Sequence, residues 1–449
     1  MRKIDINALI DQARFNSFHW RVLFWCALII IFDGYDLVIY GVVLPVLMRE
    51  WALTPLQAGA LGSYALFGMM FGALLFGSLS DRIGRKWVIA LCVVLFSGFT
   101  VLNGFARNPT EFGLCRFMAG LGIGGVMPNV VALMSEYAPK KIRSTLVAIM
   151  FSGYAVGGMF SAGLGIVLLP AFGWQSVFYV ACVPLLLLPL ILRFLPESVG
   201  FMLRQGREAQ AREVLQRIEP GLELHSDDEL HMGPLKAAGA PVLQLFREGR
   251  ALSTLMLWLA FFCCLLMVYA LNSWLPKLMN SAGYGLSSSL MFLLVLNVGA
   301  IFGAIFGAIG GGWIGDRFKL QHVLVAFFLL AALSISLLGF NSPLLVIYGL
   351  IAVAGATTIG TQILAYACVA QFYPMAIRST GLGWASGVGR SGAIVGPVLG
   401  GALVGIELPL HLNFMAFALP GAVAAIAMCF VHQRRKEQSN RVESPLVEA

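Results

Sequence analysis

The sequence predicts an all-α polytopic membrane protein with twelve transmembrane helices in two parallel six-helix repeats. Three observations support this prediction. The composition is 59% hydrophobic and only 12% charged over 449 residues, with a mean hydropathy of +0.84. Apolar runs of about 18 residues or more recur along the chain, and each can cross a hydrocarbon core of ~30 Å. Two short motifs also recur at one common offset of 235 residues, which indicates an internal repeat.

Each half of the chain is expected to contain six spans. In the first half they lie near residues 22–47, 57–79, 87–106, 111–135, 145–168 and 174–194. In the second half they lie near residues 252–276, 286–311, 322–340, 343–371, 379–404 and 411–431. The expected domains are an N-terminal six-helix bundle over 1–196, a cytoplasmic linker over 197–250, a C-terminal six-helix bundle over 251–433 and a cytoplasmic tail over 434–449.

The linker contains an Arg/Glu-rich stretch from Arg204 to Glu219. This stretch is expected to form a short surface helix with one apolar face. The rest of the linker carries no pattern of a catalytic domain.

The positions of the charges predict the orientation in the membrane. The formal net charge is +8, but Lys and Arg fall in short clusters between apolar runs. That pattern fixes membrane topology and does not indicate a nucleic-acid partner. With the N-terminus inside, all but five of the 30 Lys/Arg residues lie on the inner side. The exceptions are Arg49, Arg107 and Lys277, which lie outside, and Arg116 and Arg390, which lie within spans. Both termini and the linker are therefore predicted to be cytoplasmic, and no cleavable signal peptide is expected.

Metal, cofactor and soluble-enzyme chemistry are not expected. The eight cysteines have no metal-ligand spacing, and the six histidines are scattered. No phosphate-binding glycine loop follows a strand, so ATP-driven transport has no support. Coupling to an ion gradient, without a cofactor, is the remaining source of energy.

Two acids, Asp33 and Asp36, lie near the middle of the first span, with no other charge between Arg21 and Arg49. A charged side chain at that depth costs about 2.5–3.5 kcal/mol on insertion scales, so it marks a transport pathway or a proton relay by default. Their spacing places both on one face of a helix. The alternative is that they cap a helix break at Gly34. As a proton-coupling pair, one acid titrates while the other orients, and Asp36 is expected to receive the proton first because it lies further toward the outside.

Two arginines within spans are candidates for binding an anion. Arg390 is the only charge between Arg378 and Glu407, and it lies too deep to reach the interface easily. It needs Asp33, Asp36 or an anionic substrate as its partner, and its planar fork suits a carboxylate. Arg116 precedes a glycine-rich stretch in the fourth span. It either binds an anion, balances a titrating acid, or extends to the membrane surface.

The loop after the second span carries a set of turn-forming and charged residues: Gly77, Asp81, Arg82, Gly84, Arg85 and Lys86. Such a loop can latch neighbouring helix ends by charge-assisted hydrogen bonds that break when the two halves rock. The alternative is that its cations only set topology. Glu136 at the end of the fourth span either joins this latch or is a surface charge. The second copy keeps Asp316 and Arg317 but lacks the Gly-Arg-Lys end.

The run Asp33-Gly34-Tyr35-Asp36-Leu37-Val38-Ile39-Tyr40-Gly41 resembles the signature of the aromatic acid:proton symporter family, within the major facilitator superfamily. Further matches extend over nearly the whole chain, among them Pro128-Asn129, Pro196-Glu197-Ser198 and Phe372-Tyr373-Pro374. Within that family the chain is most similar to bacterial benzoate transporters. The resemblance implies the major facilitator fold and a bacterial inner-membrane symporter.

The resemblance also implies a substrate, an aromatic carboxylate with benzoate expected, which is imported with protons. The protein is expected to function as a monomer. Alternatives are import of a hydroxylated aromatic acid or of muconate, or export of drugs or aromatic acids, to which a Gly396-Pro397 motif in the eleventh span lends support. The expected substrate-binding residues are Arg390, Arg116, Tyr40, Asn129, Tyr154 and Trp384.

Overall fold

The computed structural model describes residues 3–221, 228–231, 242–317, 320–374 and 377–432, and for residues 308–317 it describes the helical backbone alone. Within these ranges, twelve helices or helix pairs are long and apolar enough to cross a membrane. The predicted all-α, twelve-span class is therefore confirmed.

The first six spans occupy the N-terminal half of the chain, and the sixth is divided into two short helices. They are α2 (Ser17–Glu50), α3 (Pro55–Ile83), α4 (Arg85–Asn103), α5 (Pro109–Tyr137), α6 (Arg143–Phe172), and α7 (Gln175–Tyr179) with α8 (Cys182–Phe194). Asn16, Thr54 and Asn108 start α2, α3 and α5 by accepting hydrogen bonds from backbone N–H groups of the first turn. Gly84, with φ of 96°, makes the tight turn between α3 and α4.

The C-terminal half contributes the other six spans. They are α11 (Ala251–Ser281), α12 (Leu286–Arg317), α13 (Leu320–Leu337), α14 (Leu344–Phe372), α15 (Arg378–Gly405) and α16 (Leu410–Cys429). Most helices begin or end several residues beyond the predicted spans, because the helix continues past the apolar run; the first, for example, covers 17–50 and not 22–47.

Short elements at one end of the bundle join the N-terminus to the linker. The N-terminal elements are β1 (Lys3–Asp5) and α1 (Ile6–Gln12), and those of the linker are α9 (Val199–Arg204), α10 (Glu208–Ile218), β2 (Glu229–His231) and the 3-10 helix η1 (Val242–Phe246). The expected surface helix corresponds to α10. Strands β1 and β2 pair in parallel, a contact that the sequence did not predict. Asn16 also donates hydrogen bonds to the carbonyl oxygens of Arg217 (3.1 Å) and Ile218 (2.8 Å).

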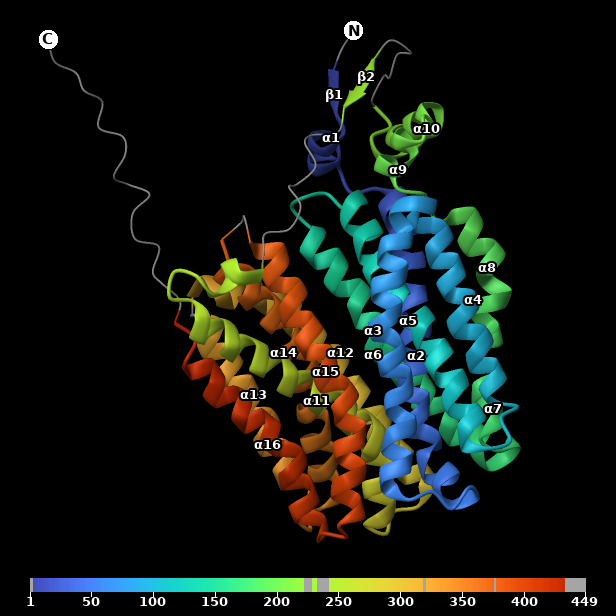
Figure 1. Ribbon diagram of the computed structural model, residues 1–449, viewed down its shortest axis with the longest axis vertical. Helices are drawn as coiled ribbons and strands as arrows, with labels where there is room; N and C mark the ends of the chain where they lie inside the picture. Colours follow the sequence, from blue (N-terminus) through green and yellow to red (C-terminus); the bar gives the residue numbers. More distant parts are fainter. Residues whose placement is uncertain (1–2, 222–227, 232–241, 318–319, 375–376, 433–449) are drawn as a thin grey trace, which may run out of the picture.

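The two halves lie side by side, the first coloured blue to green and the second yellow to red (Figure 1). They approach most closely toward the end opposite the linker. A Cβ on Gly41 of α2 would lie 2.0 Å from the carbonyl oxygen of Asn272 in α11, and one on Gly401 of α15 would lie 2.3 Å from that of Pro55. Since Pro55 begins α3, glycine-mediated backbone contacts join the halves at this end.

Candidate functional site

A cavity of about 40 Å³, here called the central cavity, lies between the two halves. Helices α3, α5 and α6 line it from one side, and α11, α14 and α15 line it from the other. Its apolar lining is Leu66, Met69, Met127, Leu265 and Ala393, and its polar lining is Tyr154, Tyr269, Gln362, Tyr366, Ser386 and Arg390. A smaller cavity of about 20 Å³ adjoins it and shares Tyr154 and Tyr269. An apolar wall with a few convergent polar groups is typical of a small-molecule site.

Arg390 of α15 is the one charged residue among those that line the central cavity. Its Nη1 is buried and has no hydrogen-bond partner. One helical turn earlier, Ser386 Oγ lies 3.0 Å from the hydroxyl of Tyr366. A buried guanidinium donor without a partner is costly, so this position suits an anionic ligand that can accept its hydrogen bonds.

Tyr154 and Tyr269 connect the two halves at this cavity. Their hydroxyl oxygens are 3.2 Å apart, one from α6 and the other from α11. Tyr154 also lies against α2, because a Cβ on Gly34 would be 2.2 Å from the carbonyl oxygen of Tyr154. This close approach places the segment of α2 that carries the two acids next to the central cavity.

Asp33 of α2 is fully buried, and neither of its carboxylate oxygens has a hydrogen-bond partner. The charge of Asp33 interacts with those of Asp36 and Arg390 through space. Tyr154 and Tyr269 both lie near Asp33 and Arg390. Asp33 is thus within electrostatic reach of the cavity arginine without being bonded to it.

Asp36 is held by partners of its own. Its Oδ1 accepts hydrogen bonds from Thr100 Oγ1 (2.6 Å) and from Arg116 Nη1 (3.1 Å). Arg116 Nη1 also donates to the backbone carbonyl of Asp36 at 3.1 Å. The Asp36 and Arg116 side chains are 2% and 1% exposed. Arg116 therefore does not extend to the membrane surface but forms a buried ion pair, and the partner of Asp36 is Arg116, not Arg390.

Besides Arg116, three of the six expected substrate-binding residues do not line the central cavity. The Tyr40 hydroxyl donates to the carbonyl oxygen of Ala58. The Asn129 amide donates to the carbonyl oxygens of Gly125 (2.8 Å) and Phe76 (3.4 Å). Trp384 stacks on Trp258 at 5.5 Å and is 44% exposed. Each of the three contacts a neighbouring helix, and their role in binding substrate stays a prediction without support from this geometry.

Sequence reasoning missed four polar residues of the central cavity: Tyr269, Gln362, Tyr366 and Ser386. A signal for them was present. Gln362 and Tyr366 are four residues apart on α14, and Ser386 and Arg390 are four apart on α15, so each pair shares one helix face.

The expected latch is present in part. Arg85 Nη1 lies 2.7 Å from Glu136 Oε2, and Glu136 Oε1 accepts a hydrogen bond from Ser198 Oγ at 2.8 Å. Glu197 Oε1 accepts from the backbone N–H groups of Arg85 (2.9 Å), Lys86 (3.3 Å) and Ser198 (2.9 Å). Burial nonetheless raises the pKa of Glu197 above its ordinary value, because desolvation outweighs these hydrogen bonds.

Gly84 lies against the Glu197 carboxylate, since a Cβ there would be 2.4 Å from Glu197 Oε2, but Gly77, Asp81 and Arg82 do not join these contacts. Asp81 and Arg82 are exposed, and Gly77 has no atom within 4 Å of where its Cβ would be. The side chains of Asp316 and Arg317 lie outside the described residues.

Comparison with known proteins identifies relatives along the whole chain. The family model described as Major Facilitator Superfamily matches residues 26–319 and 295–448. The benzoate transport protein of Acinetobacter baylyi is 48% identical over 99% of this chain and 96% of its own length. The gentisate transporter of Corynebacterium glutamicum is 38% identical over 91% of this chain and 87% of its own length.

Solved structures agree on the fold. The xylose transporter XylE from E. coli, in a partially occluded inward-open conformation, matches with a TM-score of 0.70 at 17% identity, covering 94% of this chain and 100% of that one. At this identity the match concerns the fold alone, and it confirms the predicted major facilitator architecture.

Proposed function

This chain belongs to the Major Facilitator Superfamily, and we propose that it imports an aromatic carboxylate together with protons, with benzoate as the preferred substrate. It is a multi-pass membrane transporter and not an enzyme, since its family and its named relatives are transporters. The proposal rests on Arg390, a half-buried arginine in the cavity between the halves whose buried Nη1 has no hydrogen-bond partner.

The substrate carboxylate binds Arg390, and the aromatic ring of the substrate lies between the phenol rings that line the same cavity. A hydrogen bond between charged groups contributes about 1.5–3 kcal/mol. Aromatic pairs add about 0.5–1.5 kcal/mol beyond the area they bury. The central cavity measures about 40 Å³, so the halves must move apart before a benzoate ring can enter.

Asp33 takes up the coupled proton. Its carboxylate has no hydrogen-bond partner, whereas that of Asp36 is bonded to Thr100 and Arg116. A proton on Asp33 removes the negative charge that interacts with Arg390, and the field of Arg390 then acts on the substrate carboxylate alone. When Asp33 loses this proton, its carboxylate again competes with the substrate carboxylate for Arg390, and the substrate is released. This competition supplies the coupling between the two fluxes.

Alternating access follows from rocking of the two halves. The close backbone contacts at Gly41 and Gly401 lie at the end opposite the linker. With the linker in the cytoplasm, as the distribution of Lys and Arg favours, this conformation faces inward. We further propose that the protein lies in the bacterial inner membrane, with both termini in the cytoplasm, and that it functions as a monomer.

Import of a hydroxylated aromatic acid is the second candidate. It is favoured by the polar groups that surround Arg390, namely Gln362, Tyr366 and Ser386, which can bond a ring hydroxyl. The Gly396-Pro397 motif does not favour export, because the Pro397 carbonyl accepts a hydrogen bond from Trp274 Nε1 at 2.8 Å and packs against Gly59. It belongs to the contacts that close one end.

The test is uptake of labelled benzoate into proteoliposomes that hold purified protein, with the lumen more alkaline than the outside. Accumulation that collapses with a protonophore is expected. Competition by hydroxybenzoates and by gentisate for benzoate uptake measures which of these acids the protein prefers. Benzamide, which lacks the carboxylate, should not compete. Absence of gradient-driven accumulation would refute the symport proposal, and accumulation only under the opposite gradient would indicate export.

A further inference from the structure

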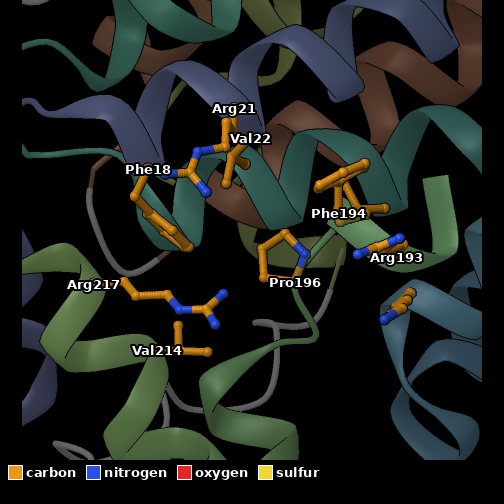
Figure 2. A pocket seen from close by; sticks show the side chains of 10 residues that line it. Phe18, Arg21, Val22, Arg193, Phe194, Pro196, Val214 and Arg217 are labelled. Atoms are coloured by element: carbon orange, nitrogen blue, oxygen red, sulfur yellow. The ribbon is translucent and has the colours of Figure 1, made fainter. Parts of the chain in front are cut away.

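A separate cavity, of about 180 Å³, lies at the linker end of the first half. It is bounded by α2, α4, α8 and α10, and we call it the basic cavity after four of its lining residues: Arg21, Lys86, Arg193 and Arg217. Among the described residues, no acid lines it. Figure 2 shows Arg21 and Arg217 reaching from opposite sides toward the space around Pro196, with Arg193 at its rim.

The charge of this cavity is only partly balanced. Arg217 forms an ion pair with Glu213 at 2.6 Å on the surface of α10, and the charge of Lys86 interacts with that of Glu197. Arg21 and Arg193 have no carboxylate partner in the part of the chain that the structure describes. The guanidinium of Arg193 instead lies 5.7 Å from the centre of the Phe194 ring. Two exposed cations therefore face a concave site without counter-charge.

The surface beside the basic cavity is of the kind that contacts lipid. Trp20 and Phe24 on α2 and Trp87 on α4 are more than half exposed. Phe194, which lines the cavity, stacks on Trp25 with ring centroids 5.8 Å apart. Aromatic side chains at the ends of membrane spans mark the level of the lipid headgroups. The cavity thus lies at the level of the membrane surface. A site for a soluble anion would not need this position.

We propose that the basic cavity binds the phosphate of an anionic phospholipid, with the lipid chains lying over the exposed aromatic residues of α2. Arg21 and Arg193 supply charge-assisted hydrogen bonds to the phosphate oxygens, for which guanidinium groups are well shaped. Basic pockets between transmembrane helices on the cytoplasmic side are suited to such headgroups. Because Arg217 belongs to α10, the bound lipid also ties the linker to the first transmembrane helix. This inference does not depend on which substrate is transported.

The test is native mass spectrometry of the full-length protein in detergent, titrated with phosphatidylglycerol or with phosphatidylcholine. Phosphatidylglycerol should form a discrete one-lipid complex, and phosphatidylcholine should bind at least about tenfold more weakly. The double variant Arg21→Gln/Arg193→Gln should lose at least about tenfold in affinity for phosphatidylglycerol, since each cation near the surface contributes on the order of 1 kcal/mol. Arg21→Lys/Arg193→Lys should retain most of the binding.

The matched control is Arg14→Gln/Arg247→Gln, which removes two exposed cations outside the cavity and should leave binding unchanged. Thermal melting of each variant checks that it is folded. Equal loss in the control, or equal binding of the two lipids, would overturn the proposal. Displacement of phosphatidylglycerol by inorganic phosphate at a similar concentration would also overturn it, because the cavity would then be a site for a soluble anion.

Discussion

Arg116 bonds both the carboxylate and the backbone carbonyl of Asp36 at 3.1 Å, whereas Asp33, three residues earlier on α2, has no hydrogen-bond partner on either carboxylate oxygen. Two acids that look equivalent in the sequence thus have different surroundings. Asp36 is fixed in a buried ion pair, and Asp33 is free to change its protonation state without breaking one. The expectation that Asp36 receives the proton first is therefore replaced by a proposal that Asp33 does.

Asp33→Asn should abolish accumulation of benzoate driven by a pH gradient. The amide keeps the shape of the side chain but cannot carry the coupled proton. Exchange of labelled for unlabelled benzoate across the membrane, which needs no net proton movement, should persist. Both are measured in proteoliposomes. Gradient-driven accumulation at the wild-type level in this variant would exclude Asp33 as the coupling site.

Arg116→Met should destabilise the protein, because it leaves the Asp36 carboxylate buried without its cation. Breaking a buried pair by removing one partner costs about 3–5 kcal/mol. The expected result is a clear fall in melting temperature in detergent. Arg82→Met, which removes an exposed cation, is the matched control and should melt like the wild type. Restoration of stability in Arg116→Met/Asp36→Leu would establish that the cost comes from the orphaned charge, and an unchanged melting temperature in Arg116→Met would contradict the argument.

The sequence was sufficient for the class of fold but not for the pairing of charges. Span number and repeat follow from hydropathy and from a common offset, which depend on short stretches of chain. Whether Asp36 faces Arg116 or Arg390 depends on how α2 is rotated between its neighbours. That rotation is set by close contacts such as Gly34 against Tyr154, and these involve residues far apart in the chain.

The position of Tyr40 illustrates the same limit. It lies in the stretch that resembles the family signature, four residues after Asp36, yet its hydroxyl is bonded to the backbone of Ala58 away from the central cavity. A motif records which residues occur together, and it does not separate those that hold the helix from those that face the cavity. Arg390 could be singled out from the sequence because a lone charge within an apolar span is costly and usually marks a functional site.

Arg390→Lys should raise the apparent KM for benzoate by about tenfold or more. Lysine keeps the charge but loses the planar fork that bonds both carboxylate oxygens, and a hydrogen bond between charged groups is worth about 1.5–3 kcal/mol. Arg378→Lys, in the first turn of the same helix, should leave KM unchanged. Uptake at varied benzoate concentration measures both. An unaltered KM in Arg390→Lys would argue against direct binding of the carboxylate.

Glu197 predicts a pH dependence of stability. Its pKa is raised in the folded protein, chiefly by burial, so the folded state binds the proton more tightly than the unfolded state does. The stabilisation from this proton is fully present below the unfolded pKa of about 4.3 and is lost as pH rises through the folded pKa. Glu197→Gln, which is neutral at every pH, should therefore gain melting temperature relative to the wild type as the pH rises from the unfolded pKa through the raised folded pKa. A relative loss over that range would show that the backbone hydrogen bonds outweigh burial.

Gly41→Ala should prevent the end opposite the linker from closing. The new Cβ would lie 2.0 Å from the carbonyl oxygen of Asn272, so the helices must separate. Overpacking of this kind costs about 1–3 kcal/mol, which shifts an equilibrium about 5–150-fold. Transport should fall by a similar factor because closure of this end is part of each cycle.

Gly349→Ala is the matched control, since a Cβ at Gly349 meets no atom within 4 Å. In a background without the eight native cysteines, Ser386→Cys places a thiol in the central cavity, and a membrane-impermeant maleimide supplied from the linker side reports its accessibility. Labelling should fall in the Gly41→Ala background and stay constant in the Gly349→Ala background. Equal labelling and equal transport in the two would mean that the contact between Gly41 and Asn272 does not hold this end closed, and that another of the glycine contacts between the halves does.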